Sequence, residues 1–176
     1  SIGGFLARLA GRSERDVMTM MTIPSTISGG ASIFQVRLGS GEVLSPGDKA
    51  DVLFAFYQHS YDNHVNNLSK GGVLVYDSDH VEPCEEWLTK YRHIGIAISS
   101  LTVEAIGGTA RDKGKNIYAL GLIAEMFSLD TTKLERLINE RFGGKGESIM
   151  KTAMDAFQAG CRYQSNDISN LFRLAR

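Results

Sequence analysis

A loop of hydroxyl groups and glycines offers the clearest material for chemistry in this 176-residue sequence. Residues 22–32 read TIPSTISGGAS, with five Ser or Thr side chains and the pair Gly29-Gly30. Hydroxyls and exposed backbone N–H groups donate hydrogen bonds without adding charge, so the loop could hold a phosphate or a carboxylate. The same hydroxyls could instead satisfy the backbone of a polar turn, and the residues by themselves favour that turn.

Two further polar stretches follow apolar runs. Asp77 and Asp79 come directly after residues 73–76, where an acid can hold a ribose hydroxyl or a metal, or can cap the following turn. Ser99 and Ser100 follow a second apolar run, but no G-x-S-x-G surrounds them. We expect these serines to form an N-cap cluster, and we predict no catalytic residue in this chain.

Acidic residues dominate one segment. Residues 77–86 contain five acids and no base, with Pro83 among them. Proline suits the first position of a helix, and acids favour its positive end, so the segment is typical of a helix start. A docking patch, with Tyr57-Gln58-His59 and Trp87 beside it, is the alternative.

Cysteines and histidines show no metal-binding spacing. Cys84 and Cys161 stand far apart without a C-x-x-C, so they cannot supply the four thiolates of an iron–sulfur cluster. They are expected to be buried or free thiols of a reducing compartment. His59 and His64 are five residues apart, not the four that would aim both rings at one metal. We predict no metal site in this chain.

Charge and hydropathy exclude two classes of partner. The chain has 19 bases, 20 acids and a net charge of -1, which gives no reason to expect nucleic acid. No apolar run is long enough to cross a bilayer, and no secretory leader opens the sequence. These features predict a cytoplasmic protein without a membrane association.

The elements that position these loops begin with a parallel sheet. Residues 52–56, 73–76 and 94–98 are short, continuously apolar runs, typical of strands buried on both faces. The stretches between them, 57–68 and 83–91, have crossover length and helical composition.

Antiparallel strands and helices complete the expected fold. A helix over 4–11 precedes a strand over 17–21, and residues 33–44 predict a hairpin that turns at Gly39-Ser40-Gly41. The last third predicts helices over the segments 116–127, 132–142 and 149–160.

Two details sharpen that helical part. Residues 116–127 are apolar nearly all round, which indicates a central buried helix. Thr132 and Glu135 predict a capping box. The sequence thus predicts an α/β domain of three layers, with a mainly parallel (mixed) sheet, a hairpin excursion and a helical C-terminal third.

Four segments in order resemble a known family. ISGGASIFQVRLG, VLSPGDKADVLFAF, GGVLVYDSD and KNIYALG look like the gamma subunit or domain of 2-oxoacid:ferredoxin (acceptor) oxidoreductases, the pyruvate and 2-oxoglutarate family. The resemblance runs from about Thr22 to Tyr163. Each segment alone is a weak signal, and the ordered set is specific.

The resemblance implies an activity for the whole enzyme. Members of the family oxidatively decarboxylate a 2-oxoacid with thiamine diphosphate, pass electrons through iron–sulfur clusters to ferredoxin, and form an acyl-coenzyme A. The thiamine diphosphate and the clusters are then expected on partner subunits of alpha and beta type. The gamma domain is expected on the coenzyme A side and in assembly.

The resemblance also implies binding residues and boundaries. The cofactor-binding positions it indicates are Pro24, Ser28, Gly29, Gly30, Ser32 and Asn116. Residues 1–163 are expected to form the gamma-type domain, without the family's initial strand and Gly-rich turn, and 164–176 a tail or linker. A free-standing nucleotide- or coenzyme A-binding α/β protein and a non-catalytic interaction domain remain the alternatives. The sequence contains neither G-x-G-x-x-G after a strand nor a Walker A motif.

Overall fold

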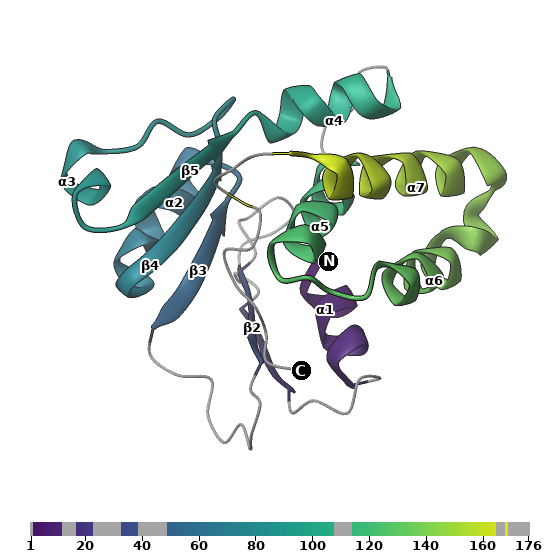
Figure 1. Cartoon of the computed structure of the whole chain (residues 1–176), viewed down its shortest axis with the longest axis horizontal. Coiled ribbons are helices and arrows are strands. Elements are labelled where there is room, and N and C mark those ends of the chain that lie inside the picture. Colours follow the sequence, from purple (N-terminus) through teal and green to yellow (C-terminus); the bar gives the residue numbers. More distant parts are fainter. Residues whose placement is uncertain are drawn as a thin grey trace. The chain divides into compact units, whose positions relative to one another are not determined.

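The computed structural model describes residues 2–11, 17–22, 33–38, 49–107, 114–164 and 168 (Figure 1). The chain divides into two compact units. Residues 47–101 form the first, which we call the sheet unit. Residues 1–46 and 102–176 form the second, which we call the helical unit.

Three parallel strands form the centre of the sheet unit. They are β3 (Ala50–Ala55), β4 (Leu68–Asp77) and β5 (Arg92–Ile96), in the order β3-β4-β5. Leu53 pairs with Leu74, and Val75 pairs with Ile94. Leu74 and Val75 are fully buried, so the continuous apolar run of β4 is that of a strand covered on both faces. The predicted parallel sheet is confirmed.

Short helices connect these strands. The connections contain α2 (Gln58–His64) with the 3₁₀ turn η1 (Val65–Asn67), and α3 (Glu85–Leu88). The helix predicted over 83–91 is therefore too long. The Thr89 hydroxyl donates to the Glu86 carbonyl at 2.9 Å, and the chain enters β5 at Arg92, which leaves no room for a second turn.

A pair of antiparallel strands belongs to the helical unit. β1 (Val17–Thr22) pairs with β2 (Ile33–Leu38) along its whole length, with Met20 opposite Gln35. The hairpin predicted within 33–44 placed the partner of β2 at 42–44, which lies outside the described residues. The described partner of β2 is β1.

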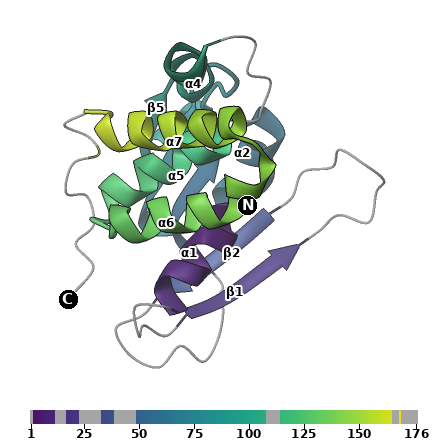
Figure 2. The same cartoon turned by 90° about the vertical axis from the view of Figure 1, so that its right-hand side faces the viewer.

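The described part of the helical unit also contains helices. They are α1 (Ile2–Gly11), α5 (Lys115–Met126), α6 (Thr131–Phe142), η2 (Gly143–Lys145) and α7 (Glu147–Arg162). Figure 2 shows α5, α6 and α7 side by side. α5 is the central one, because all its residues except Asn116 and Glu125 are buried. The predicted central helix is confirmed.

The capping box predicted for α6 is wrong. The helix begins at Thr131, and Asp130 is its N-cap, with its carboxylate accepting from the Lys133 N–H at 3.0 Å. Thr132 is already inside the helix, while Glu135 accepts a hydrogen bond from Gln158 of α7 at 3.2 Å. Asp is a strong N-cap residue, so the earlier acid prevails over the Thr–Glu pair.

α4 (Ile98–Ile106) begins in the sheet unit and ends in the helical unit. The predicted α/β class is confirmed, with its parallel sheet, antiparallel strands and helical C-terminal third. Within the described part of the chain, every helix is too short or too polar to span a bilayer.

Candidate functional site

The carboxyl ends of β4 and β5 bring two of the predicted loops together. Asp77, the last residue of β4, is fully buried, and its carboxylate accepts from the Ser99 hydroxyl at 2.6 Å and from the Ser99 N–H at 3.3 Å. It also accepts from the Asp79 N–H at 3.2 Å. Asp77 thus caps the turn after its own strand and ties that turn to α4, which was one of the two roles predicted for it.

Asp79 repeats this arrangement one step further out. Its carboxylate accepts from the Ser100 N–H at 2.7 Å and from the Ser100 hydroxyl at 3.0 Å. The first turn of α4 is therefore capped by one acid at the end of β4 and one in the turn after it, and both acids favour a helix N-terminus. Ser99 and Ser100 were predicted to act as N-cap residues. In the structure their own N–H groups donate to the carboxylates of Asp77 and Asp79.

Aromatic rings gather at the carboxyl ends of β3 and β4. The Tyr57 ring lies 5.7 Å from the His59 ring, centroid to centroid, with 7° between their planes. It lies 5.7 Å from the His80 ring at 37°. Both imidazoles are exposed and the phenol is half-buried. The sequence placed Tyr57-Gln58-His59 beside the acidic segment 77–86 as the alternative docking patch, but it did not show that the rings of Tyr57, His59 and His80 would meet.

One histidine belongs to a polar network in the interior of the sheet unit. His93 Nδ1 lies 2.9 Å from the Tyr91 carbonyl oxygen, so in the neutral ring Nδ1 donates and Nε2 accepts. Tyr61 donates its hydroxyl to Nε2 at 3.1 Å and accepts from the Cys84 N–H at 3.1 Å. Burial raises the pKa of Tyr61 above its usual value. This histidine therefore takes part in a structural network of the sheet unit.

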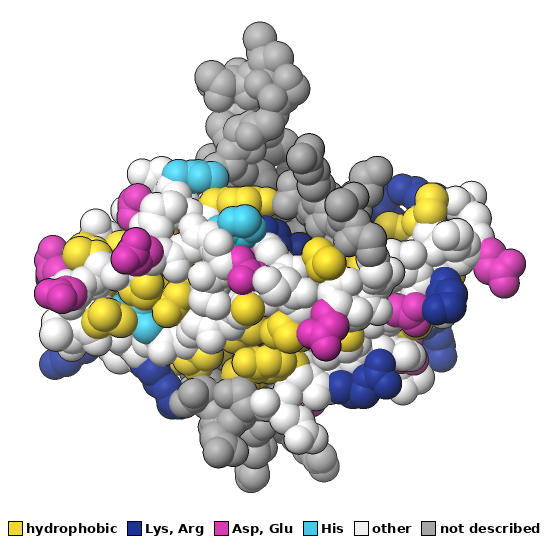
Figure 3. Space-filling view, turned by 90° about the horizontal axis from the view of Figure 1, so that it is seen from above, with side chains coloured by type: hydrophobic (Ala, Val, Ile, Leu, Met, Phe, Trp, Pro, Cys, Tyr) yellow, Lys and Arg dark blue, Asp and Glu magenta, His cyan; other side chains and the backbone are white. Residues whose placement is uncertain are grey.

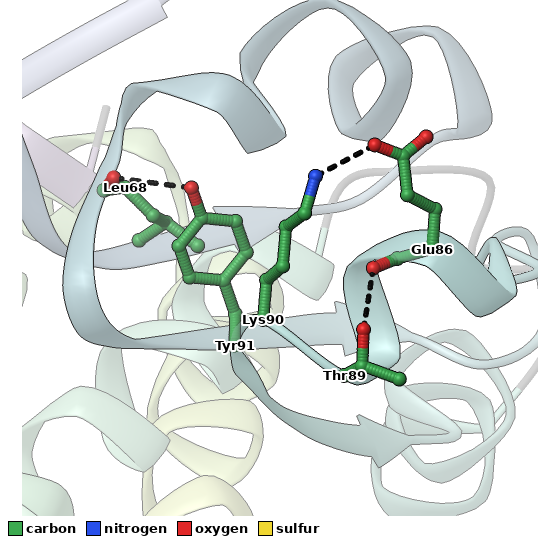
Figure 4. A network of polar contacts seen from close by, with 5 residues as sticks. All are labelled: Leu68, Glu86, Thr89, Lys90 and Tyr91. Carbon is green, nitrogen blue, oxygen red and sulfur yellow. Dashed lines mark hydrogen bonds and ion pairs between the residues drawn. The ribbon is translucent and has the colours of Figure 1, made fainter.

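The segment around α3 holds its charges in a local network (Figure 4). Lys90 pairs with Glu86 at 2.7 Å and lies 4.3 Å above the Trp87 ring. The Trp87 ring stacks on Tyr91 at 5.9 Å, and the Tyr91 hydroxyl donates to the Leu68 carbonyl at 3.4 Å. The predicted helix start is met in part: Glu85 and Glu86 occupy the first turn of α3, but Cys84 is its N-cap, so Pro83 lies outside the helix and not at its first position.

Both cysteines are free thiols. Cys84 is exposed, while Cys161 is half-buried on α7. Burial, with a smaller effect of Glu125, raises the pKa of the Cys161 thiol from 9.0 to about 11. Burial likewise raises the pKa of Tyr118 to about 12. In the described part of the chain, no three His, Cys, Asp or Glu side chains gather as metal ligands would.

A shallow hollow of about 200 Å³ lies between α6 and α7. It is lined by Thr131, Glu135, Phe157, Gln158, Cys161 and Arg162. Its volume is below the roughly 300–1,000 Å³ of pockets that enclose a cofactor-sized ligand. This hollow is too small to hold a nucleotide cofactor.

The predicted binding residues fall mostly elsewhere. Pro24, Ser28, Gly29, Gly30 and Ser32 lie outside the described residues. Asn116 is the second residue of α5, and its side chain is exposed. Asn116 lies at the start of the buried helix α5, and because its side chain is exposed, its amide can reach a ligand without disturbing the core.

Comparison with known proteins decides the family. Residues 1–163 match the family described as pyruvate ferredoxin/flavodoxin oxidoreductase. The chain belongs to this family. The resemblance to 2-oxoacid:ferredoxin oxidoreductases is therefore confirmed.

Two relatives are oxidoreductase subunits. The 2-oxoglutarate oxidoreductase subunit KorA of Mycobacterium tuberculosis is 31% identical over 152 residues, 76% of this chain and 23% of that protein. The ketoisovalerate oxidoreductase subunit VorA of Methanothermobacter thermautotrophicus is 27% identical over 146 residues, 80% of this chain and 28% of that protein. The chain thus spans about a quarter of the length of these curated relatives.

Solved structures share the fold. A 2-oxoglutarate:ferredoxin oxidoreductase from Magnetococcus marinus, with 2-oxoglutarate, coenzyme A and succinyl-CoA bound, matches with a TM-score of 0.83 and 27% identity. The match covers 99% of this chain and 30% of that one. The gamma subunit of a keto/oxoacid ferredoxin oxidoreductase from Geobacter sulfurreducens matches in fold, with a TM-score of 0.66 and 22% identity over 92% of this chain and 90% of that one.

Proposed function

We propose that this chain is the gamma-type domain of an enzyme that oxidatively decarboxylates a 2-oxoacid to an acyl-coenzyme A and passes electrons to ferredoxin. In this proposal the chain acts on the coenzyme A side and in assembly with alpha- and beta-type partners in the cytoplasm. Thiamine diphosphate and the iron–sulfur clusters lie on those partners, and the chain is not catalytic alone.

One observation carries the proposal. The Magnetococcus enzyme that holds coenzyme A and succinyl-CoA contains a region whose fold follows 99% of this chain with a TM-score of 0.83. The composition of the chain agrees with a subunit that binds no iron–sulfur cluster, because the chain has two cysteines and both are free thiols. Four cysteine thiolates are the usual ligand set of an iron–sulfur cluster.

Coenzyme A contact is proposed for two places. The loop residues Pro24, Ser28, Gly29, Gly30 and Ser32 combine hydroxyls with glycines, which allow a phosphate to approach the backbone closely. Asn116 is exposed near the start of α5, where an amide can donate to a phosphate or thioester oxygen.

The test uses the complete enzyme that contains this chain. Coenzyme A-dependent reduction of ferredoxin is measured with several 2-oxoacids, for the wild type and for Gly29→Val, Gly30→Val and Asn116→Ala. Each change is expected to raise the KM for coenzyme A about tenfold, because about one charge-assisted hydrogen bond to coenzyme A is lost. The KM for the 2-oxoacid should stay nearly unchanged.

Asn139→Ala is the matched control for Asn116→Ala. Asn139 is also an exposed asparagine on a helix, α6, so the same amide is lost with the same gain in helix propensity. Its coenzyme A kinetics should stay at wild-type values. Lower assembly of the glycine variants, with an unchanged KM per assembled complex, would show that the glycines only shape a turn. Activity without coenzyme A would refute the proposed reaction.

A further inference from the structure

Two rings of the aromatic cluster at the carboxyl ends of β3 and β4, those of His59 and His80, are exposed, and the loop that carries His80 also carries the exposed acids Asp79 and Glu82. Tyr57, His59 and His80 supply the rings, Glu82 supplies an exposed acid, and Asp79 supplies a second acid whose carboxylate also accepts from Ser100; we call these five residues the aromatic–acidic surface. Figure 3 looks onto the side of the sheet unit to which the strands point, with histidine side chains exposed beside acidic ones. All five residues belong to the sheet unit.

Hydrogen bonds within the chain hold this surface in place. The Gln58 side chain accepts from the Glu82 N–H at 2.8 Å and donates to the Glu82 carbonyl at 3.2 Å, which ties the start of α2 to the loop after β4. The Tyr57 carbonyl accepts from the N–H of Tyr61 at 3.1 Å, and the His80 N–H donates to the Asp77 carbonyl at 3.0 Å. A surface ordered in advance loses little entropy when a partner binds.

Charge is separated along the strands of the sheet unit. Lys49 precedes β3, Lys70 lies in the first half of β4, and Arg92 begins β5, so these bases stand toward the amino ends. Residues 50–69 and 71–89 contain no Lys or Arg. In the described part of the chain, the Glu82 carboxylate forms no ion pair. Among the described residues of the sheet unit, the carboxyl edge therefore carries acids without bases, which favours cations over phosphates.

We propose that the aromatic–acidic surface docks an arginine-bearing segment of a partner chain, which the proposed function takes to be another subunit. A guanidinium is planar, so it can stack on the Tyr57 and histidine rings while it donates two hydrogen bonds to the Glu82 carboxylate. Exposed aromatic rings bind apolar or cationic groups, and the neighbouring acids favour a cationic group over an apolar one. Arginine is the side chain that can both stack on the rings and pair with a carboxylate.

The first test measures binding of a defined probe to the full chain. The probe is the blocked peptide acetyl-Gly-Arg-Ala-Arg-Gly-amide, followed by nuclear magnetic resonance at about pH 8, where free imidazole is neutral. The expected result is a set of shifts at residues 57–59 and 79–82, with a dissociation constant that weakens at least about threefold between roughly 20 and 300 mM NaCl. The lysine version of the peptide should bind more weakly.

Variants separate this surface from general electrostatics. Glu82→Gln and His59→Ala should each weaken the peptide at least about threefold, because each removes one contact with the guanidinium. Glu147→Gln removes an equally exposed acid from the first turn of α7 and should leave binding unchanged. No binding, equal binding by Glu82→Gln, or displacement of the peptide by coenzyme A would overturn the proposal.

The second test uses the assembled enzyme. Glu82→Arg should lower the amount of partner subunits that co-purify at moderate salt, while Glu147→Arg should not. Unchanged assembly of the Glu82→Arg enzyme would also overturn the proposal. The KM for coenzyme A in the Asn116→Ala enzyme is measured separately, so failure of this interface and failure of the proposed coenzyme A role are distinguishable.

Discussion

Two glycines allow α5 and α7 to cross at backbone contact, and adding one methyl group there should separate the helices. A Cβ on Gly160 would overlap the carbonyl oxygen of Tyr118 in α5. It would also lie 3.0 Å from the Tyr118 carbonyl carbon and 3.1 Å from the Gly121 Cα. These neighbours are backbone atoms of a buried helix, so no side chain can rotate away.

The expected loss follows from that geometry. Ordinary Cβ contacts begin at 3.4 Å, so Gly160→Ala must move α7 from α5 by at least 0.4 Å at the Tyr118 carbonyl carbon, and by more at its oxygen. A gap of about 0.5–1 Å forfeits about a quarter to a half of each dispersion contact. Ala156 and Phe157 of α7 are fully buried and would lose part of theirs. We expect Gly160→Ala to lower the free energy of unfolding by about 3 kcal/mol.

Urea unfolding followed by far-ultraviolet circular dichroism measures this change. Gly143→Ala is the matched control, because Gly143 has helical dihedral angles (φ −56°, ψ −32°) and open space around its Cα. Its free energy of unfolding should rise by about 0.4–1 kcal/mol, since alanine has fewer unfolded conformations.

Gly121 lies on the opposite side of the same crossing, where a Cβ would come 2.7 Å from the Cys161 nitrogen. The double change Gly121→Ala with Gly160→Ala should therefore cost less than the sum of the single changes, since helices already separated have room for the second methyl group. Wild-type stability of Gly160→Ala would refute the reasoning, and so would equal losses in Gly160→Ala and Gly143→Ala.

Two further predictions concern the buried polar groups. Tyr61→Phe leaves the Cys84 N–H and His93 Nε2 without their partner, and should lower the free energy of unfolding by about 1–3 kcal/mol in urea titrations; a neutral change would show that water replaces the hydroxyl. In a Cys84→Ser background, Cys161 should react with iodoacetamide at about pH 8 at least about tenfold more slowly in native protein than in urea, because a pKa of about 11 instead of 9.0 lowers its thiolate fraction. A raised pKa stabilises the fold below pH 9.0, and this contribution is lost as the pH rises toward about 11. Equal alkylation rates in the two states would contradict the burial of this thiol.

Local pattern was enough for the main elements and the family. The run at 73–76 has the length and composition of a strand buried on both faces, and it became the C-terminal part of β4. Residues 116–127 are apolar on every side, which suits only the middle of a helical core, and they became α5 within one residue at each end. The ordered motifs indicated the family, and the match over residues 1–163 confirms it.

Contacts between distant residues were decided by the tertiary structure. Asp77 and Asp79 cap α4 from 22 and 21 residues away. The hydrophobic periodicity of a strand or helix repeats every two to four residues, so it cannot predict pairs this far apart in the sequence. The neighbouring carboxyl ends of two parallel strands create them. The rings of Tyr57 and His80 meet for the same reason, and no local pattern of a single strand shows which rings will be neighbours.

Glycines illustrate the limit most directly. In the sequence, Gly121 weakens the helix predicted over 116–127, and Gly160 marks the end of the helix predicted over 149–160, whereas α7 continues to Arg162. In the structure, they are the positions where a Cβ has no room, because the two backbones touch. Helix propensity acts within one segment, whereas a crossing is a property of two, so the sequence determined that both helices form and only their packing decided why these residues are glycine.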